Sequence, residues 1–138
     1  MKISISMAYE RGFALRKVEE LAKEVAEHLL KCYLMPESSY RKGWLKELAA
    51  WLDSSYVYGN IKSSRLKRKD YLHTLFAQCD EGALESRFLN SIKPEYPVDL
   101  EWDQSVVHKI EVFASKAAEQ LSKKKAIVWR EWLDKALL

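Results

Sequence analysis

Glycine and proline are scarce in this sequence of 138 residues, which contains four glycines and three prolines. Both residue types interrupt helices, whereas the abundant alanine, leucine, glutamate and lysine suit helix interiors. Two cysteines, Cys32 and Cys79, are too few for a disulfide framework. The composition therefore predicts a mainly helical protein that does not depend on disulfide bonds.

Long apolar runs are also missing. The N-terminal residues "MKISISMAYERGF" lack the continuous apolar stretch of a signal peptide, and no later run approaches the length of a membrane span. We therefore expect no membrane association and a reducing, cytoplasmic location. The sequence contains no P-loop, nucleophile elbow or glycine-rich dinucleotide-binding motif. Its carboxylates show no spacing that singles out a catalytic acid/base pair. We expect a protein without a cofactor, and an enzyme is the less favoured class.

Helical periodicity runs through most of the chain, because apolar residues recur at intervals of three and four. Pro36 stops the first helix, Ser38 or Ser39 can cap the second, and Ser63 or Ser64 can cap the third, which is expected to end at Gly82. Asp103 can cap the fifth helix. The expected helices are residues 7–34, about 39–53, about 64–82, 83–92, and 104–137, the last as either one helix or two.

Two segments do not fit this pattern. Residues 1–6 alternate polar and apolar side chains, which indicates an extended arm that could dock on a partner or on a second copy in a homodimer. Residues 93–103 contain two prolines and several acids, which indicates a loop. Because amphipathic helices without strands must bury their apolar sides against each other, residues 1–138 are predicted to form one all-α domain, a bundle of five or six helices.

The net charge is only +3, so the distribution of basic residues matters more than their sum. The stretch "IKSSRLKRKDYLH", residues 61–73, has five basic residues and one acid. Lysine and arginine side chains on one face can neutralise phosphates, although such runs are often just solvated helix faces. The candidate binding residues are Lys62, Arg65, Lys67, Arg68 and Lys69, with a second cluster at Lys123, Lys124, Lys125 and Arg130. The expected partner is nucleic acid or a ribonucleoprotein, and an acidic protein would satisfy the same charges.

Arg68 and His73 are separated by four residues. This spacing resembles the motif of the HEPN ribonucleases, which are small helical bundles that cut RNA without a metal. The resemblance implies that His73 moves protons while Arg68 stabilises phosphate charge, as the two side-chain types allow. A metal-independent ribonuclease using Arg68 and His73 is therefore the alternative function. Lys69 stands where that family favours Asn, Asp or His.

Other residues have less specific patterns. His28 and Cys32 lie one helical turn apart, but no second close pair completes a zinc motif, so we expect them to have a buried structural role and no metal to be bound. Tyr96 and Trp102 lie in the acidic loop and are candidate anchors for a protein partner, because tyrosine and tryptophan often dominate binding energy. A pure protein-interaction module is thus a further alternative.

The segment "LAKEVAEHLLKCYLMPESSYRKGW", residues 21–44, resembles the signature of the bacterial family called domain of unknown function twenty-nine. The matching positions are His28, Leu29, Leu30, Lys31, Pro36, Glu37, Arg41 and Trp44. The resemblance implies a small helical fold and no particular activity. The sequence as a whole favours a non-enzymatic binding protein that acts by surface contact, of a kind suited to a phage, a mobile element or a defence complex.

Overall fold

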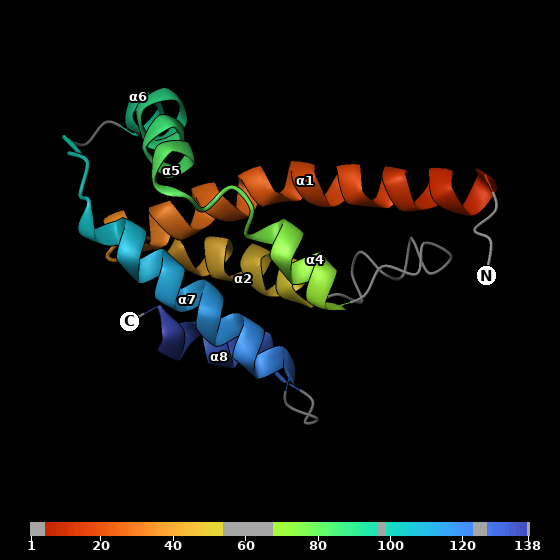
Figure 1. Cartoon of the computed structure of the whole chain (residues 1–138). Coiled ribbons are helices and arrows are strands. Elements are labelled where there is room, and N and C mark those ends of the chain that lie inside the picture. Colours follow the sequence, from red (N-terminus) through yellow and green to blue (C-terminus); the bar gives the residue numbers. More distant parts are fainter. Residues whose placement is uncertain (1–4, 54–67, 97–98, 123–126, 138) are drawn as a thin grey trace.

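The computed structural model describes residues 5–53, 68–96, 99–122 and 127–137, and these residues form an all-helical bundle (Figure 1). In chain order the elements are α1 (Ile5–Leu34), α2 (Arg41–Leu52), α4 (Arg68–Leu75), α5 (Glu81–Arg87), a π-helical segment (Phe88–Ile92), α6 (Lys93–Glu95), α7 (Ser105–Ser122) and α8 (Trp129–Ala136). The predicted all-α fold is confirmed.

The long helix α1 is the centre of the bundle, because α2, α4, α5 and α7 all pack against it. From Val18 onward its apolar residues recur every three or four positions, so they form a continuous stripe that helical geometry turns to one side. The stripe is completely or almost completely buried, and consists of Val18, Ala22, Val25, Ala26, Leu29, Leu30 and Cys32. Figure 1 shows that the N-terminal part of α1 extends beyond the other labelled helices.

Aromatic side chains join the later helices to this core. Phe113 of α7 is buried between Phe76 and Trp132, with ring centroids 5.9 Å and 5.5 Å away. Such tilted and edge-on ring pairs add stability beyond the area that they bury. Trp129 is also buried, at 7% exposure. Its ring packs edge-on against Trp132 at the start of α8.

Several predicted boundaries are corrected. Residues 5 and 6 belong to α1 and not to an extended arm, since extending a helix adds a hydrogen bond and no described strand pairs with this segment. Lys93–Glu95 forms the turn α6 instead of loop, because proline is tolerated where a helix starts. Residues 104–137 contain two helices, since Ile127 and Val128 are not helical. Residues 1–4 lie outside the described part of the chain.

The predicted helix caps are partly right. Asp103 accepts hydrogen bonds from the backbone N–H and the hydroxyl of Ser105 at the start of α7, as expected. Tyr40, however, is the N-cap of α2, and Ser38 instead accepts from the Tyr40 N–H. The third helix ends at Leu75 and not at Gly82, because Asp80 accepts from the Ala83 N–H and starts α5. Ser63 and Ser64 lie outside the described residues.

The helices within the described ranges include none with the length and apolar character needed to cross a bilayer.

Two leucines provide a test of the core. Leu48 on α2 is fully buried, whereas Leu89 is 49% exposed. Leu48→Ala should lower the free energy of unfolding by roughly 2–5 kcal/mol, because it leaves a cavity. Leu89→Ala removes the same atoms from an exposed side chain and should change the free energy of unfolding by less than about 0.5 kcal/mol. Urea denaturation followed by circular dichroism measures both, and equal losses would contradict this packing.

Candidate functional site

The basic residues singled out in the sequence lie mostly outside the residues that the structure describes. Lys62, Arg65 and Lys67 fall outside the described residues, as do Lys123, Lys124 and Lys125. Arg68 and Lys69 form the start of α4, where the structure describes the backbone but not the side chains. Arg130 lies in the first turn of α8 and is exposed.

The described helices show where these segments attach to the bundle. Because the helices alternate in direction, α2 ends, α4 begins, α7 ends and α8 begins at the same end of the molecule (Figure 1). The chain between α2 and α4 carries the first basic segment, and the chain between α7 and α8 carries the second. The described helix ends that flank the two clusters therefore lie at one end of the bundle. We call this the basic end, defined by Leu52, Arg68, Ser122 and Trp129.

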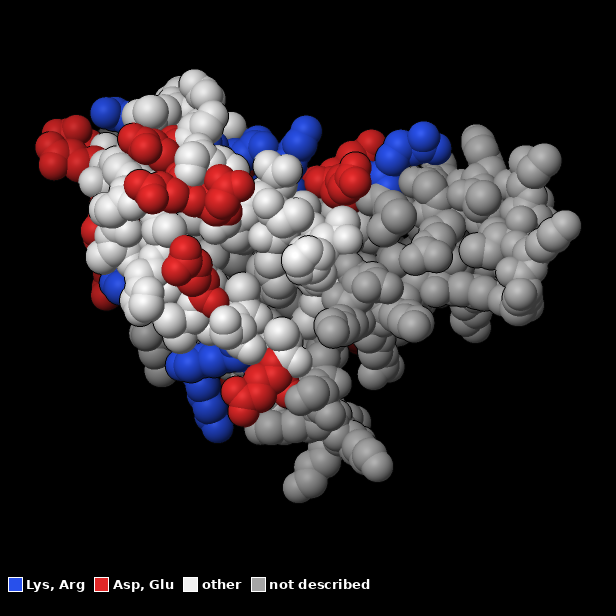
Figure 2. Space-filling view, in the orientation of Figure 1, with Lys and Arg blue, Asp and Glu red and all other residues white. Residues whose placement is uncertain are grey.

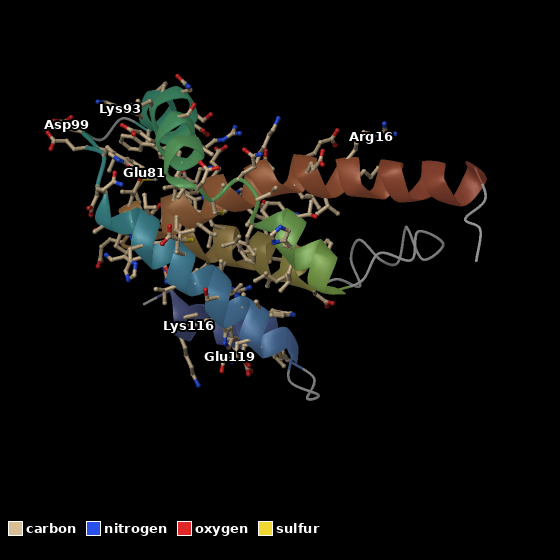
Figure 3. The ribbon with its side chains drawn as sticks, viewed as in Figure 1. Arg16, Glu81, Lys93, Asp99, Lys116 and Glu119 are labelled. Atoms are coloured by element: carbon tan, nitrogen blue, oxygen red, sulfur yellow. The ribbon has the colours of Figure 1, made fainter. Side chains whose placement is uncertain are left out.

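The opposite end is acidic. From residue 80 to residue 111 the sequence has eight acidic and three basic side chains, so its local charge opposes that of the basic end. On the face shown in Figure 2, acidic side chains gather over α5 and the segment that leads into α7. Figure 3 labels Glu81 and Asp99 there, together with Lys93. Hydrogen bonds from Ser105, and secondarily the charge of Lys109, lower the pKa of Asp103 in the same region.

His73 lies on α4 at the rim of a surface cleft between α4 and α7. The cleft has a volume of about 370 Å³ and is lined by Leu72, His73, Phe76, Ala77, Ala114, Ser115 and Ala118. His73 itself is exposed, so its imidazole is accessible to a ligand. Arg68 stands five residues earlier on the same helix, so the two backbone positions are roughly 140° apart around the axis. The helix thus carries both residues of the ribonuclease motif without aligning them on one face.

Lys31 is the principal polar group of the core that the sequence analysis did not single out. It is 7% exposed, yet its ammonium lies 3.3 Å from the Glu27 carboxylate. The same ammonium faces the rings of Trp44 and Tyr96, with centroids 5.7 Å and 5.6 Å away. Burial by itself lowers the pKa of Lys31, but Glu27 and the Tyr96 hydroxyl outweigh it, so the pKa is raised above its ordinary value. Lys31 therefore joins α1, α2 and the end of α6.

His28 forms a second polar junction between α1 and α2. Its Nδ1–H donates to the Glu24 carbonyl at 2.8 Å, and Nε2 contacts the Glu47 carboxylate. The ring also packs edge-on against Trp51, with centroids 4.8 Å apart. Both ring nitrogens thus face protein oxygens, which gives His28 a structural role. Within the described ranges, no three His, Cys, Asp or Glu side chains are arranged to hold a metal.

The two cysteines are buried, as expected. Burial, partly offset by Arg41 and Lys31, raises the pKa of Cys32 to about 11. Burial, with a further contribution from Asp80, raises the pKa of Cys79 to about 12. Both thiols are therefore protonated near neutral pH and pack as small apolar groups.

The two aromatic residues proposed as partner anchors are half-buried. Tyr96 packs edge-on against Trp44 with centroids 6.1 Å apart, in the junction formed by Lys31. Trp102 packs on Phe88 with centroids 5.6 Å apart, and its indole N–H donates to Gln104. Each side chain is thus already engaged within the chain, and only part of its surface is available to a partner.

Sequence signals for the polar junctions differ in strength. Glu27 and Lys31 are four residues apart on a helix, a spacing that favours an ion pair and could have been recognised. His28 and Glu47 are 19 residues apart on different helices, and nothing local relates them. Their meeting depends on how α2 folds back along α1.

Comparison with known proteins identifies no relative: no protein-family model, no curated protein and no solved structure matches this chain.

The Lys31 junction generates a pH-dependent prediction. Lys31→Met should lower the free energy of unfolding by roughly 1–3 kcal/mol at pH 7, because Glu27 loses its charged partner. Since the folded-state pKa is raised above the ordinary value of 10.5, the stabilisation should be complete below pH 10.5 and decline as pH rises through the folded-state pKa.

Urea denaturation of both proteins between pH 7 and pH 11.5 measures this difference. Lys46→Met on α2 removes an exposed lysine and should change the free energy of unfolding by less than about 0.5 kcal/mol at any pH in that range. A Lys31→Met deficit that is unchanged at the highest pH would contradict a role for the ammonium charge.

Proposed function

We propose that this protein is a non-enzymatic binding protein, and that its basic end contacts nucleic acid. The observation that supports the proposal is the direction of the helices, because the described helix ends that flank both lysine- and arginine-rich segments lie at one end of the bundle. A single segment of five basic residues is common on solvated helices, whereas two such segments near one end would concentrate positive charge. Phosphate groups are the ligands that such a concentration favours, because each contact releases condensed counterions.

The charge of the opposite end supports the same proposal. Acidic side chains from residues 80 to 111 repel a phosphate backbone, so they orient the molecule with its basic end toward nucleic acid. Three basic groups that are buried or half-buried have partners within the protein. Lys31 pairs with Glu27 within α1, whereas the pairs His28–Glu47 and Arg41–Asp134 each join two helices. The surface thus supplies the groups that meet a partner.

The proposal predicts binding that depends steeply on salt. Labelled single-stranded and double-stranded oligonucleotides, titrated by fluorescence anisotropy, should bind with an affinity that falls linearly on a log–log plot of affinity against salt. Lys67→Ala with Arg68→Ala should weaken binding to all sequences alike and reduce the slope by about one to two units, since roughly 0.7–0.9 counterions are released per contact.

The matched control removes one arginine and one lysine from the acidic end, with Arg87→Ala and Lys93→Ala, and should leave affinity and slope unchanged. No binding at 50 mM salt, or equal losses in the two double variants, would refute the proposal. Binding to an acidic protein but to neither oligonucleotide would instead assign the basic end to a protein partner.

The accessible imidazole of His73 favours one alternative function, a HEPN-like ribonuclease that uses Arg68 and His73. Such an enzyme should cut RNA in the presence of EDTA, and DNA of the same sequence should stay intact, because cleavage uses the 2′-hydroxyl. His73→Ala should abolish the cutting, while His108→Ala, a matched change of an exposed histidine on α7, should not. Gel analysis of end-labelled RNA decides this, and intact RNA would rule out the enzyme.

A further inference from the structure

A second pocket lies where the end of α1 meets α7 and α8. It has a volume of about 350 Å³ and is lined by Cys32, Tyr33, Pro36, His108, Lys109, Val112, Lys116, Ala136 and Leu137. This volume falls at the lower end of the range for small-molecule sites, which is about 300–1,000 Å³. The pocket runs along α7 from His108 to Lys116 and meets the end of α8, so most of its lining lies away from the basic end (Figure 1).

The charged side chains that line the pocket are all basic. Lys109 and Lys116 are seven residues apart, so two turns of α7 place both lysines on the same side of the helix, and His108 adds an imidazole beside them. No carboxylate is among the lining residues, and no described carboxylate forms an ion pair with either lysine. Figure 3 labels Lys116 on α7 close to α8. Glu111 and Glu119, the acidic residues of α7, are not among the lining residues, so the pocket is locally positive.

The rest of the lining is apolar or uncharged. Val112, Pro36, Ala136 and Leu137 supply apolar surface, and Val112 is exposed at 38%. Burial, with a contribution from Cys32, raises the pKa of Tyr33 to about 12, so its hydroxyl is neutral near pH 7 and donates to the Lys109 carbonyl at 3.5 Å. The Cys32 thiol is protonated as well. Neither residue adds negative charge that would oppose an anion.

We propose that this pocket binds a small organic anion, whose carboxylate or phosphate group meets Lys109 and Lys116 while its apolar body packs against Val112 and the end of α8. A few convergent polar groups beside an apolar surface are the usual composition of a small-molecule site. The shared chemistry is an anionic head beside an apolar surface, which a medium-chain fatty carboxylate has along its chain and a nucleoside monophosphate has on the faces of its base. The site is separate from the basic end and does not depend on nucleic-acid binding.

The probe for the test is 1-anilinonaphthalene-8-sulfonate, an organic anion whose fluorescence rises in apolar sites. It should bind the full chain, and either decanoate or adenosine 5′-monophosphate should displace it, which identifies the body that the pocket prefers. Decanol has the same chain as decanoate without the charge and should compete about tenfold more weakly, because a charged hydrogen-bonded head is lost.

Substitutions in and outside the lining test whether the probe binds in this pocket. Lys109→Gln with Lys116→Gln should weaken probe binding about tenfold, because both cationic partners are removed. Lys42→Gln with Lys46→Gln removes two exposed lysines of α2 and should have no effect. Val112→Asp adds a carboxylate to the apolar floor and should also weaken binding. Circular dichroism checks that each variant is folded.

Three results would overturn the proposal: unchanged binding in the Lys109/Lys116 double variant, an equal loss in the Lys42/Lys46 control, or displacement by decanol as strong as by decanoate. Either of the first two results would show that the probe binds at another surface, such as the cleft beside His73. The third would show that the pocket does not recognise the anionic group. Failure of nucleic-acid binding at the basic end would leave every one of these expectations unchanged.

Discussion

Burial of the apolar stripe on α1 is the constraint on which the bundle depends. From Val18 to Cys32 this stripe has almost no contact with solvent, and helices α2, α4, α5 and α7 cover it. Three of those helices, α2, α4 and α5, have twelve residues or fewer, and an isolated short helix is marginal in water. They are stable because each adds its own apolar face to the same surface. Their directions are therefore set by how they pack along α1, whereas α8 packs on α2.

Two polar side chains interrupt this otherwise apolar interior, and both are compensated. Lys31 has Glu27 and two aromatic rings as partners, while His28 has Glu47 and the Glu24 carbonyl. A buried polar group without such partners costs free energy that neighbouring apolar packing must offset. Because the partners come from different helices, these contacts also favour one relative arrangement of α1, α2 and the turn α6 over others.

The same helix directions separate charge along the molecule. Antiparallel packing sends successive helices to opposite ends of the bundle. The described helix ends that flank the two lysine-rich segments therefore share one end, and acidic residues between 80 and 103 lie at the other. A molecule with this distribution has an orienting electrostatic field even though its net charge is only +3. The pocket beside α8 departs from this pattern, since Lys109 and Lys116 place positive charge next to an apolar surface. The charge distribution along the molecule is the basis for proposing nucleic acid as one ligand, and the charge of the pocket is the basis for proposing a small organic anion as another.

The sequence by itself determined the local features of the fold. The spacing of Val18, Val25 and Leu29 predicted α1, Pro36 predicted its end, and Asp103 predicted the start of α7. Helix formation and capping involve residues a few positions apart, so their signals are written in short stretches of sequence.

Only the tertiary structure decided which distant groups meet. It paired His28 with Glu47, buried Trp129, enclosed Tyr96 against Trp44, and brought the four ends of α2, α4, α7 and α8 together. Periodicity tells which face of a helix is apolar but not which helix covers that face. The pocket at Lys109 and Lys116 was therefore invisible in the sequence, because its walls come from three helices that are separated along the chain.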